Sequence, residues 1–192
     1  MTPPQDDSTR VATQIHDAAS SLALHEEVLG VYSAAHSDQG HDPWAAPDRF
    51  WERLVDIYAR TRDFAMVTAR MDGAVVGYAF GSPRDESNEI WQAVRSALPS
   101  VSPPDASAEP APVYIFREFA VRPDWQRRGV GRVLHDALLS TRPEPLAHLL
   151  VRQDNAWARA AYLSWGWRRI GQQRPFPDSQ VFDAMVRTLP LT

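Results

Sequence analysis

The feature that most constrains the fold of this chain is the alternation of strand and helix patterns between Val113 and Trp167. An apolar run typical of a strand is followed by a helix-periodic run, and the same order then repeats. The segments are a strand at 113–121, a helix at 129–139, a strand at 146–151, and a helix that Asp154 or Asn155 caps and Gly166 ends. Since a strand–helix–strand connection joins parallel strands, this half predicts a parallel pair with one helical crossover.

The first half of the chain adds helices and an antiparallel hairpin. Apolar residues at helical spacing predict helices over 18–32, with Asp17 as N-cap, and over 49–60. Strand patterns at 64–71 and 74–81 are joined by Asp72-Gly73, a strong signal for a hairpin turn. Further strands are predicted at 10–15, 168–172 and 180–189. These elements predict an α/β (mixed α+β) fold, in which a mixed central sheet of about seven strands carries helices on both faces.

The length of 192 residues fits one domain with a proper core. We expect a polar, flexible tail at 1–9 and a single domain over 10–192. Within that domain, 82–112 is predicted to be an insertion of a short helix and a loop rich in Pro, Ser and Ala. The loop, 98–112, is unusually long for a compact domain, so it is either a lid or a disordered segment.

Composition excludes several classes of function. The net charge of −4 argues against a nucleic-acid partner. The chain has no cysteine, which excludes a cysteine nucleophile and a thiolate metal site, and we expect no metal. No apolar run approaches the roughly 20 residues that span a bilayer, and the N-terminus lacks the features of a signal peptide. We therefore expect a cytoplasmic protein that does not act at a membrane.

Two glycines, Gly129 and Gly131, stand at the start of the helix at 129–139. A dinucleotide fingerprint would require a third glycine where Leu134 stands, and a P-loop would require a lysine, which the chain lacks. Cations at a helix N-terminus are unfavourable unless an anion is bound there, and four surround this one: Arg122, Arg127, Arg128 and Arg132. The alternative is a loop whose glycines only permit tight packing, but the charges favour a phosphate or pyrophosphate ligand.

Two motifs resemble the GNAT (Gcn5-related) N-acetyltransferase family. The stretch Gln126-Arg127-Arg128-Gly129-Val130-Gly131 matches that family's Q/R-x-x-G-x-G/A motif. A second block matches N-x-x-A-x-x-x-Y-x-x-x-G-[FW] through Asn155, Ala158, Tyr162, Gly166 and Trp167. The resemblance covers roughly 113–170 and implies the GNAT acyl-CoA N-acyltransferase fold.

The resemblance also implies that acetyl-CoA is the cosubstrate. In that family the glycine-rich loop cradles the pyrophosphate through backbone N–H groups, and the preceding strand bulges and pairs with the pantetheine arm. The next parallel strand splays away, and the arm lies in the gap. The implied cofactor-binding residues are Phe119, Ala120, Val121, Gln126, Arg127, Arg128, Gly129, Val130, Gly131, Arg132, Asn155 and Ala158.

Two residues are candidates for acid–base catalysis. The resemblance makes Tyr162 the general acid that protonates the departing thiolate, although a helix tyrosine can also be plain core. Glu118 is the candidate base, because a carboxyl group in an otherwise apolar strand has its pKa raised toward useful values. An ion pair of Glu118 with Arg117 or with a neighbouring strand is the alternative. The oxyanion would be held by a backbone N–H near Phe119.

The acceptor is less constrained by the sequence. His41, Trp44 and Trp51 are candidates to wall an acceptor pocket, or the tryptophans cap the sheet. Relatives that acetylate protein N-termini often carry a glutamate five residues before the Asn, where this chain has Leu150. That difference favours a small-molecule primary amine, attacked directly in a ternary complex. The alternatives are a peptide or protein N-acetyltransferase and a non-catalytic acyl-CoA-binding regulatory module, and a homodimer through the C-terminal strands is left open.

Overall fold

The structure is a computed structural model that describes residues 11–37, 46–101, 111–175 and 179–191. The chain divides into two compact units. The first unit comprises Met1–Gly81 and Glu118–Leu138, and the second comprises Ser82–Arg117 and Leu139–Thr192. The described strands form a seven-stranded mixed sheet in the order β1-β2-β3-β4-β5-β7-β6, which confirms the predicted fold class.

The hairpin of the first unit is confirmed. β1 (Ala12–His16) pairs antiparallel with β2 (Ala65–Met71), and β2 pairs antiparallel with β3 (Ala74–Arg84). Asp72 and Gly73 join β2 to β3 with φ values of 49° and 81°. Both lie in the left-handed region that a tight hairpin turn requires and that glycine adopts without strain.

The helix predicted over 18–32 is two helices, α1 (Ala18–Leu22) and α2 (His25–Ala35). Asp17 is the N-cap of α1, as predicted, and its Oδ1 accepts a hydrogen bond of 2.8 Å from the backbone N–H of Ser20. The side chain of Ser21 donates to the Asp17 carbonyl oxygen at 2.6 Å. Such bonds compete with helix continuation, and the acidic first turn of α2 favours a new start.

The second predicted helix of this unit also differs at its end. Pro47 begins α3 (Pro47–Arg53), where its fixed φ suits the first turn. The chain then continues as one π-helical turn, Leu54–Tyr58, in place of the α-helix predicted as far as residue 60.

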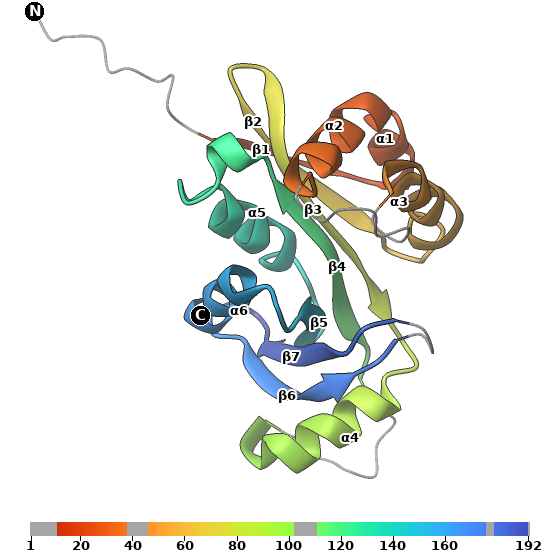
Figure 1. Cartoon of the computed structure of the whole chain (residues 1–192). Coiled ribbons are helices and arrows are strands. Elements are labelled where there is room, and N and C mark those ends of the chain that lie inside the picture. Colours follow the sequence, from red (N-terminus) through yellow and green to blue (C-terminus); the bar gives the residue numbers. More distant parts are fainter. Residues whose placement is uncertain (1–10, 38–45, 102–110, 176–178, 192) are drawn as a thin grey trace, which may run out of the picture. The chain divides into compact units, whose positions relative to one another are not determined.

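Helices cover both faces of the strands in the first unit (Figure 1). One face of β3 presents Tyr78 and Phe80, which pack in a buried cluster with Tyr32 of α2 and Phe50 of α3. On the other face, a Cβ added at Gly77 would meet Leu134 of α5 (Val130–Leu139) at 2.9 Å. The approach of α5 to this strand therefore depends on the missing side chain at Gly77.

The second unit is built around the parallel pair. β5 (Leu146–Arg152) follows α5 and pairs in parallel with β4 (Val113–Val121), through Tyr114 with Ala147 and Ile115 with His148. β7 (Phe182–Thr188) pairs antiparallel with both β5 and β6 (Arg168–Gln173). The predicted crossover is present, since β4, α5 and β5 follow one another along the chain.

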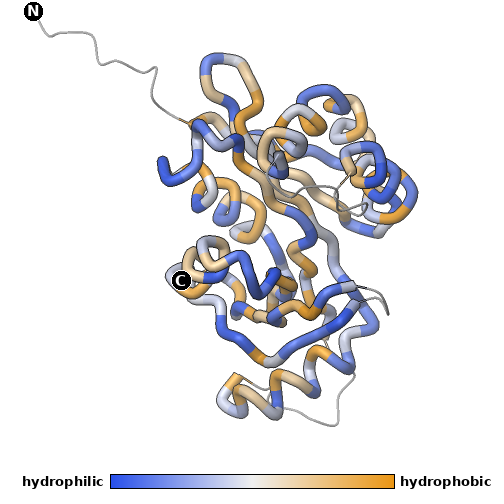
Figure 2. Tube along the Cα trace, viewed as in Figure 1, coloured by the Kyte–Doolittle hydropathy of each residue, from blue (hydrophilic) through white to orange (hydrophobic). Residues whose placement is uncertain are grey.

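The predicted inserted helix is α4 (Asn88–Ala97), which alternates between hydrophobic and hydrophilic residues (Figure 2). Its buried residues Ile90, Trp91 and Val94 pack with Val113 and Ile115 of β4. The tail at 1–9 and the part of the predicted loop at 102–110 lie outside the described residues. None of the helices in the described ranges has the length and apolar character that crossing a membrane requires.

α6 (Ala156–Ser164) ends where the sequence predicts. Gly166 follows the helix with φ of 85°, the left-handed conformation that closes many helices. A Cβ at this position would also collide with the guanidinium of Arg187. Both the backbone conformation and the close side chain explain why a glycine stands here.

Candidate functional site

The loop between β4 and α5 has an unusual backbone. Arg127 and Gly129 both have positive φ, 58° and 83°. The side chain of Gln126 ties the loop to the end of β4, because its Nε2 donates to the Val121 carbonyl oxygen at 3.0 Å. A Cβ at Gly129 would meet nothing within 4 Å, so the space beside it is open. Left-handed residues ahead of a helix N-terminus turn backbone N–H groups toward a common point, which suits an anion.

One of the four arginines around this loop is paired with a carboxylate. Arg132 forms an ion pair with Asp136 one turn along α5, with 2.6 Å between Nε and Oδ2. Arg128 stacks its guanidinium 5.1 Å from the ring centre of Trp125. Within the described ranges, Arg122 and Arg127 form no ion pair. Within those ranges only Arg132 of the four has its charge paired, and Arg122, Arg127 and Arg128 keep charges that would attract an anion.

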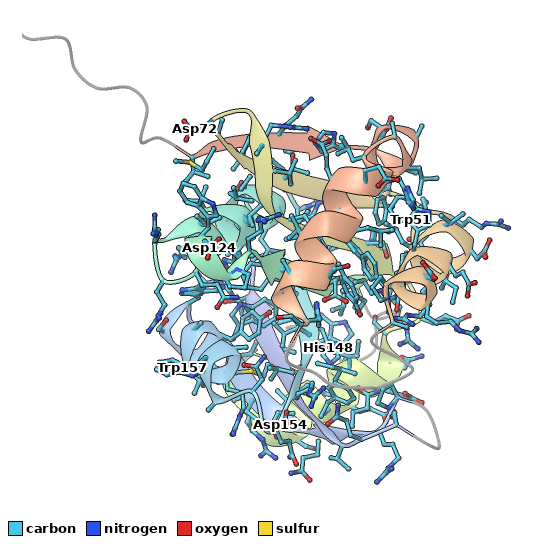
Figure 3. The ribbon with its side chains drawn as sticks, turned by 45° about the horizontal axis from the view of Figure 1, so that its top comes forward. Trp51, Asp72, Asp124, His148, Asp154 and Trp157 are labelled. Atoms are coloured by element: carbon cyan, nitrogen blue, oxygen red, sulfur yellow. The ribbon has the colours of Figure 1, made fainter. Side chains whose placement is uncertain are left out.

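At the start of α6, the structure decides between the two predicted N-caps, Asp154 and Asn155. The side chain of Asn155 accepts a hydrogen bond of 3.0 Å from the backbone N–H of Ala158, so Asn155 is the N-cap. Asp154 pairs with Arg152 instead, at 2.7 Å. Asp154 and Trp157, labelled in Figure 3, flank the cap and are exposed. The cap uses only the amide oxygen of Asn155, which leaves its exposed NH2 group able to donate to a ligand.

Tyr162 is buried among aromatic side chains. Its ring makes edge-on contacts with Phe116, Trp165 and Trp167 at centre-to-centre distances of 6.3, 5.7 and 5.8 Å. Only 7% of the residue is exposed. The packing role that the sequence allowed for Tyr162 is present, and its role as general acid stays a prediction.

Glu118 lies in β4 in the first unit and is half-buried. Burial raises the pKa of its carboxyl group above the ordinary value. The charges that oppose this rise are those of His36 at the end of α2 and Arg53 in α3. The backbone N–H of Phe119 donates weakly to Oε1 at 3.4 Å. Within the described part of the chain Glu118 forms no ion pair, so the structure does not show the alternative role, a pairing with Arg117 or a neighbouring strand.

The side chains around Glu118 were not foreseen from the sequence. Tyr78 of β3 is fully buried, and its hydroxyl has no hydrogen-bond partner among the described residues. Burial raises the pKa of Tyr78 well above its ordinary value, and the nearby charge of Glu118 adds to the rise. His36, Arg53 and Tyr78 come from three elements far from Glu118 in sequence, and no local pattern connects them.

The structure gives little support to the residues predicted to line an acceptor pocket. Trp51 is half-buried in α3, lies 4.5 Å edge-on from the ring of His25, and packs against the buried cluster of the first unit. This is the capping role that the sequence left open for the tryptophans. His41 and Trp44 lie outside the described residues. Leu150 is in β5, paired with Ala184 of β7.

The structure gathers the predicted cofactor residues in two sets. Phe119, Ala120, Val121 and the loop at 126–132 follow Glu118 in the first unit, and Asn155, Ala158 and Tyr162 share one helix in the second. The bulge predicted in β4 stays a prediction. The described residues contain no group of three His, Asp or Glu side chains suited to hold a metal ion.

Comparisons with known proteins converge on one family. Residues 21–167 match the model of the "Acetyltransferase (GNAT) family". The N-alpha-acetyltransferase RimI of Mycobacterium tuberculosis (strain ATCC 25618 / H37Rv) is 31% identical over 137 residues, which are 71% of this chain and 69% of that protein.

Solved structures agree in fold. Ard1 from Thermoplasma volcanium superposes with a TM-score of 0.58 and 20% identity, covering 94% of this chain and 99% of its own. The ribosomal-protein-S18-alanine N-acetyltransferase from Escherichia coli gives 0.55 and 21% identity, covering 94% and 95%.

Proposed function

The chain belongs to the GNAT family of acetyltransferases, and from this premise we propose that it moves the acetyl group of acetyl-CoA to a peptide or protein N-terminal amine. The observation that carries the proposal is the loop at 126–132, whose sequence fits the family motif and whose backbone is shaped for an anion. Acetyl-CoA supplies the thioester. Attack of the amine on that thioester would be direct, since the chain has no cysteine to carry an acyl group.

The residues of the loop fit a pyrophosphate. Its ligands would be the backbone N–H groups at the start of α5, with Arg127 and Arg122 supplying charge. The open space beside Gly129 leaves room for the phosphate oxygens. As the family resemblance implies, the backbone of Phe119, Ala120 and Val121 would hold the pantetheine arm. The amide NH2 of Asn155 would be a further donor to the cosubstrate.

Glu118 would act as the base. A carboxyl group with a raised pKa takes a proton more readily than an ordinary carboxylate, which suits removal of the proton from the attacking amine. The thiolate of CoA would take its proton from Tyr162. Because a free thiol has a pKa of about 8.5, this thiolate is already a fair leaving group, and loss of Tyr162 should slow turnover less than loss of Glu118.

A peptide acceptor replaces the small-molecule amine that the sequence favoured. The RimI relative, identical at 31% of positions, is named as an N-alpha-acetyltransferase, which supports an α-amine acceptor. Leu150 is the one observation that still favours a small amine, because it stands where such relatives often have glutamate. A small-molecule amine is therefore the second candidate.

A thiol-release assay with acetyl-CoA distinguishes the two acceptors. The panel contains peptides with free N-termini, the same peptides with blocked N-termini, polyamines and aminoglycosides. We expect release with free peptides only, with the acetyl group placed on the α-nitrogen by mass spectrometry. Equal release with blocked peptides or with the small amines alone would contradict the peptide acceptor, and no release with any amine would contradict the transferase itself.

A further inference from the structure

Three side chains of α5 form a hydrogen-bonded chain. Nδ1 of His135 lies 2.7 Å from Oδ1 of Asp136, and the other carboxylate oxygen, Oδ2, lies 2.6 Å from Nε of Arg132. Burial opposes the charge of Asp136, but the hydrogen bonds from Arg132 and His135 hold its pKa below the ordinary value. The carboxylate is therefore ionised at neutral pH and only accepts, so Nδ1 of His135 carries a hydrogen. Each oxygen of Asp136 is thus engaged by one neighbour.

The buried imidazole anchors this chain. The side chain of His135 is fully buried, whereas 39% of the Asp136 side chain and 43% of the Arg132 side chain are exposed. An ordinary surface ion pair contributes little, partly because two mobile side chains lose conformational freedom when they pair. Here His135 already holds the carboxylate, so Arg132 pairs with a group that has little freedom left to lose. The guanidinium is consequently held in one orientation.

The order of the two charges along α5 is the reverse of the order that stabilises a helix. An acidic residue four positions before a basic residue is the better arrangement, because the helix N-terminus carries partial positive charge. Arg132 instead precedes Asp136 and lies in the first turn of α5. Helix stability alone therefore does not explain the pair, whereas an anion bound at the helix start would favour a cation there.

Arg132 has donors left for such an anion. Its ion pair uses Nε, and within the described ranges neither terminal nitrogen of the guanidinium forms a hydrogen bond. The backbone N–H of Val133 donates to the Gly129 carbonyl oxygen at 3.1 Å. The N–H groups of the preceding residues, Val130, Gly131 and Arg132, come too early in the helix for such a bond. The first turn thus combines backbone N–H groups that lack helical partners with a fixed guanidinium.

We propose that Asp136 and His135 are positioning residues, which hold the guanidinium of Arg132 for the pyrophosphate of acetyl-CoA. This inference rests on the proposed function, in which the loop at 126–132 binds that group. A guanidinium that is fixed at Nε presents its two terminal nitrogens as a fork, which matches two phosphate oxygens. The pair of Arg132 and Asp136 carries no net charge. It therefore contributes orientation and leaves the net attraction to the other arginines of the loop.

The substitution Asp136→Asn tests this role, because orientation and charge predict opposite results. It releases the guanidinium, and we expect the Kd for CoA, measured by isothermal titration, to rise about 3-fold to 10-fold. If Asp136 only offset a positive charge, its removal would instead tighten CoA binding. The kcat/KM for acetylpantetheine, the same thioester without the pyrophosphate, should be unchanged. Tighter or unchanged CoA binding, or an equal loss with acetylpantetheine, would overturn the proposal.

A second ion pair of the first unit provides the matched control. Asp56 and Arg60 are also four residues apart, with 3.0 Å between Oδ1 and a terminal guanidinium nitrogen. Because this pair is not anchored at the start of α5, Asp56→Asn should leave the Kd for CoA unchanged. A rise equal to that of Asp136→Asn would contradict a specific role for Asp136.

Further variants test the order of the chain. Arg132→Lys keeps the charge but removes the fork, so it should weaken CoA binding to a similar extent, and Asp136→Asn should then cause no further loss. His135→Leu should also weaken binding, whereas His135→Asn, which keeps a donor near the position of Nδ1, should bind CoA as the wild type does. Additive losses, or equal binding by the two His135 variants, would overturn the proposal. A wild-type protein that binds no CoA would contradict the proposed function itself, before any variant is compared.

Discussion

Two carboxyl groups on different strands, one in each unit, have opposite surroundings. Asp183 of β7 is 2% exposed, and three donors lie 3.0 Å from its oxygens: Gln153, Arg159 and Arg169. The hydrogen bond from Gln153, together with those two arginines, lowers the pKa of Asp183 despite its burial. Within the ranges that the structure describes, Glu118 of β4 has one weak donor, the backbone N–H of Phe119, and burial raises its pKa.

The difference fits a structural role for Asp183 and the proposed role of Glu118 as the base. A carboxylate whose oxygens are saturated by donors gains nothing from a proton, and Asp183 links β7 to β6 through Arg169 and to α6 through Arg159. A carboxylate that is dehydrated and poorly paired accepts a proton readily. The protein therefore tolerates an electrostatic cost at Glu118 that it avoids at Asp183, as expected of a site that transfers protons.

Exchanging each carboxylate for its amide gives the largest contrast in turnover. Glu118→Gln removes the proton acceptor, and we expect kcat to fall by about 100-fold to 10,000-fold. Asp183→Asn is the matched control, because it makes the same chemical change on another strand and should keep turnover near the wild-type value below its melting temperature. Similar kcat losses in the two variants would contradict the distinction between the roles of Glu118 and Asp183.

At neutral pH, the two amide substitutions should change the free energy of unfolding in different directions. Asp183→Asn leaves two arginines without their charged partner, and we expect a loss of about 1–3 kcal/mol in the free energy of unfolding. The arginines are partly exposed and recover water, which limits this cost. Glu118→Gln should be neutral or stabilising, because it removes a dehydrated charge. Urea unfolding of both variants measures this, and a larger loss for Glu118→Gln would contradict the contrast.

The smallest expected effect is the pH dependence of these stability differences. The lowered pKa of Asp183 contributes stability above its unfolded value, about 3.9, and this is lost as the pH falls through the folded value. The raised pKa of Glu118 has the opposite sign. Its favourable contribution is complete below about 4.3 and disappears as the pH rises through the folded value. The deficit of Asp183→Asn should therefore shrink on acidification, and so should any gain of Glu118→Gln.

Patterns within single elements were predictable from the sequence. The parallel crossover, the Asp72-Gly73 turn and the end of α6 at Gly166 each depend on a few consecutive residues, and the structure confirms all three. The break between α1 and α2 was missed, because serines that bond back to the Asp17 carbonyl look ordinary in a helical pattern. The family motif located the loop at 126–132 because that motif also consists of a few consecutive residues.

The surroundings of Glu118 required the folded chain. Its raised pKa was foreseen from an apolar strand, but His36, Arg53 and Tyr78 reach it only through the packing of α2, α3 and β3. For Arg128 and Arg132, the sequence did not reveal the contacts that the fold makes. Asp136 pairs with the charge of Arg132, and Trp125 stacks on Arg128 without neutralising its charge.

The most direct test of Glu118 as the base is the pH dependence of kcat/KM for acetyl transfer. For the wild type, we expect a fall in kcat/KM on the acid side with an apparent pKa above that of an ordinary glutamate, about 4.3. The residual activity of Glu118→Gln should lack this fall. An acid limb of the same position in Glu118→Gln would contradict the assignment, because another group would then be taking the proton.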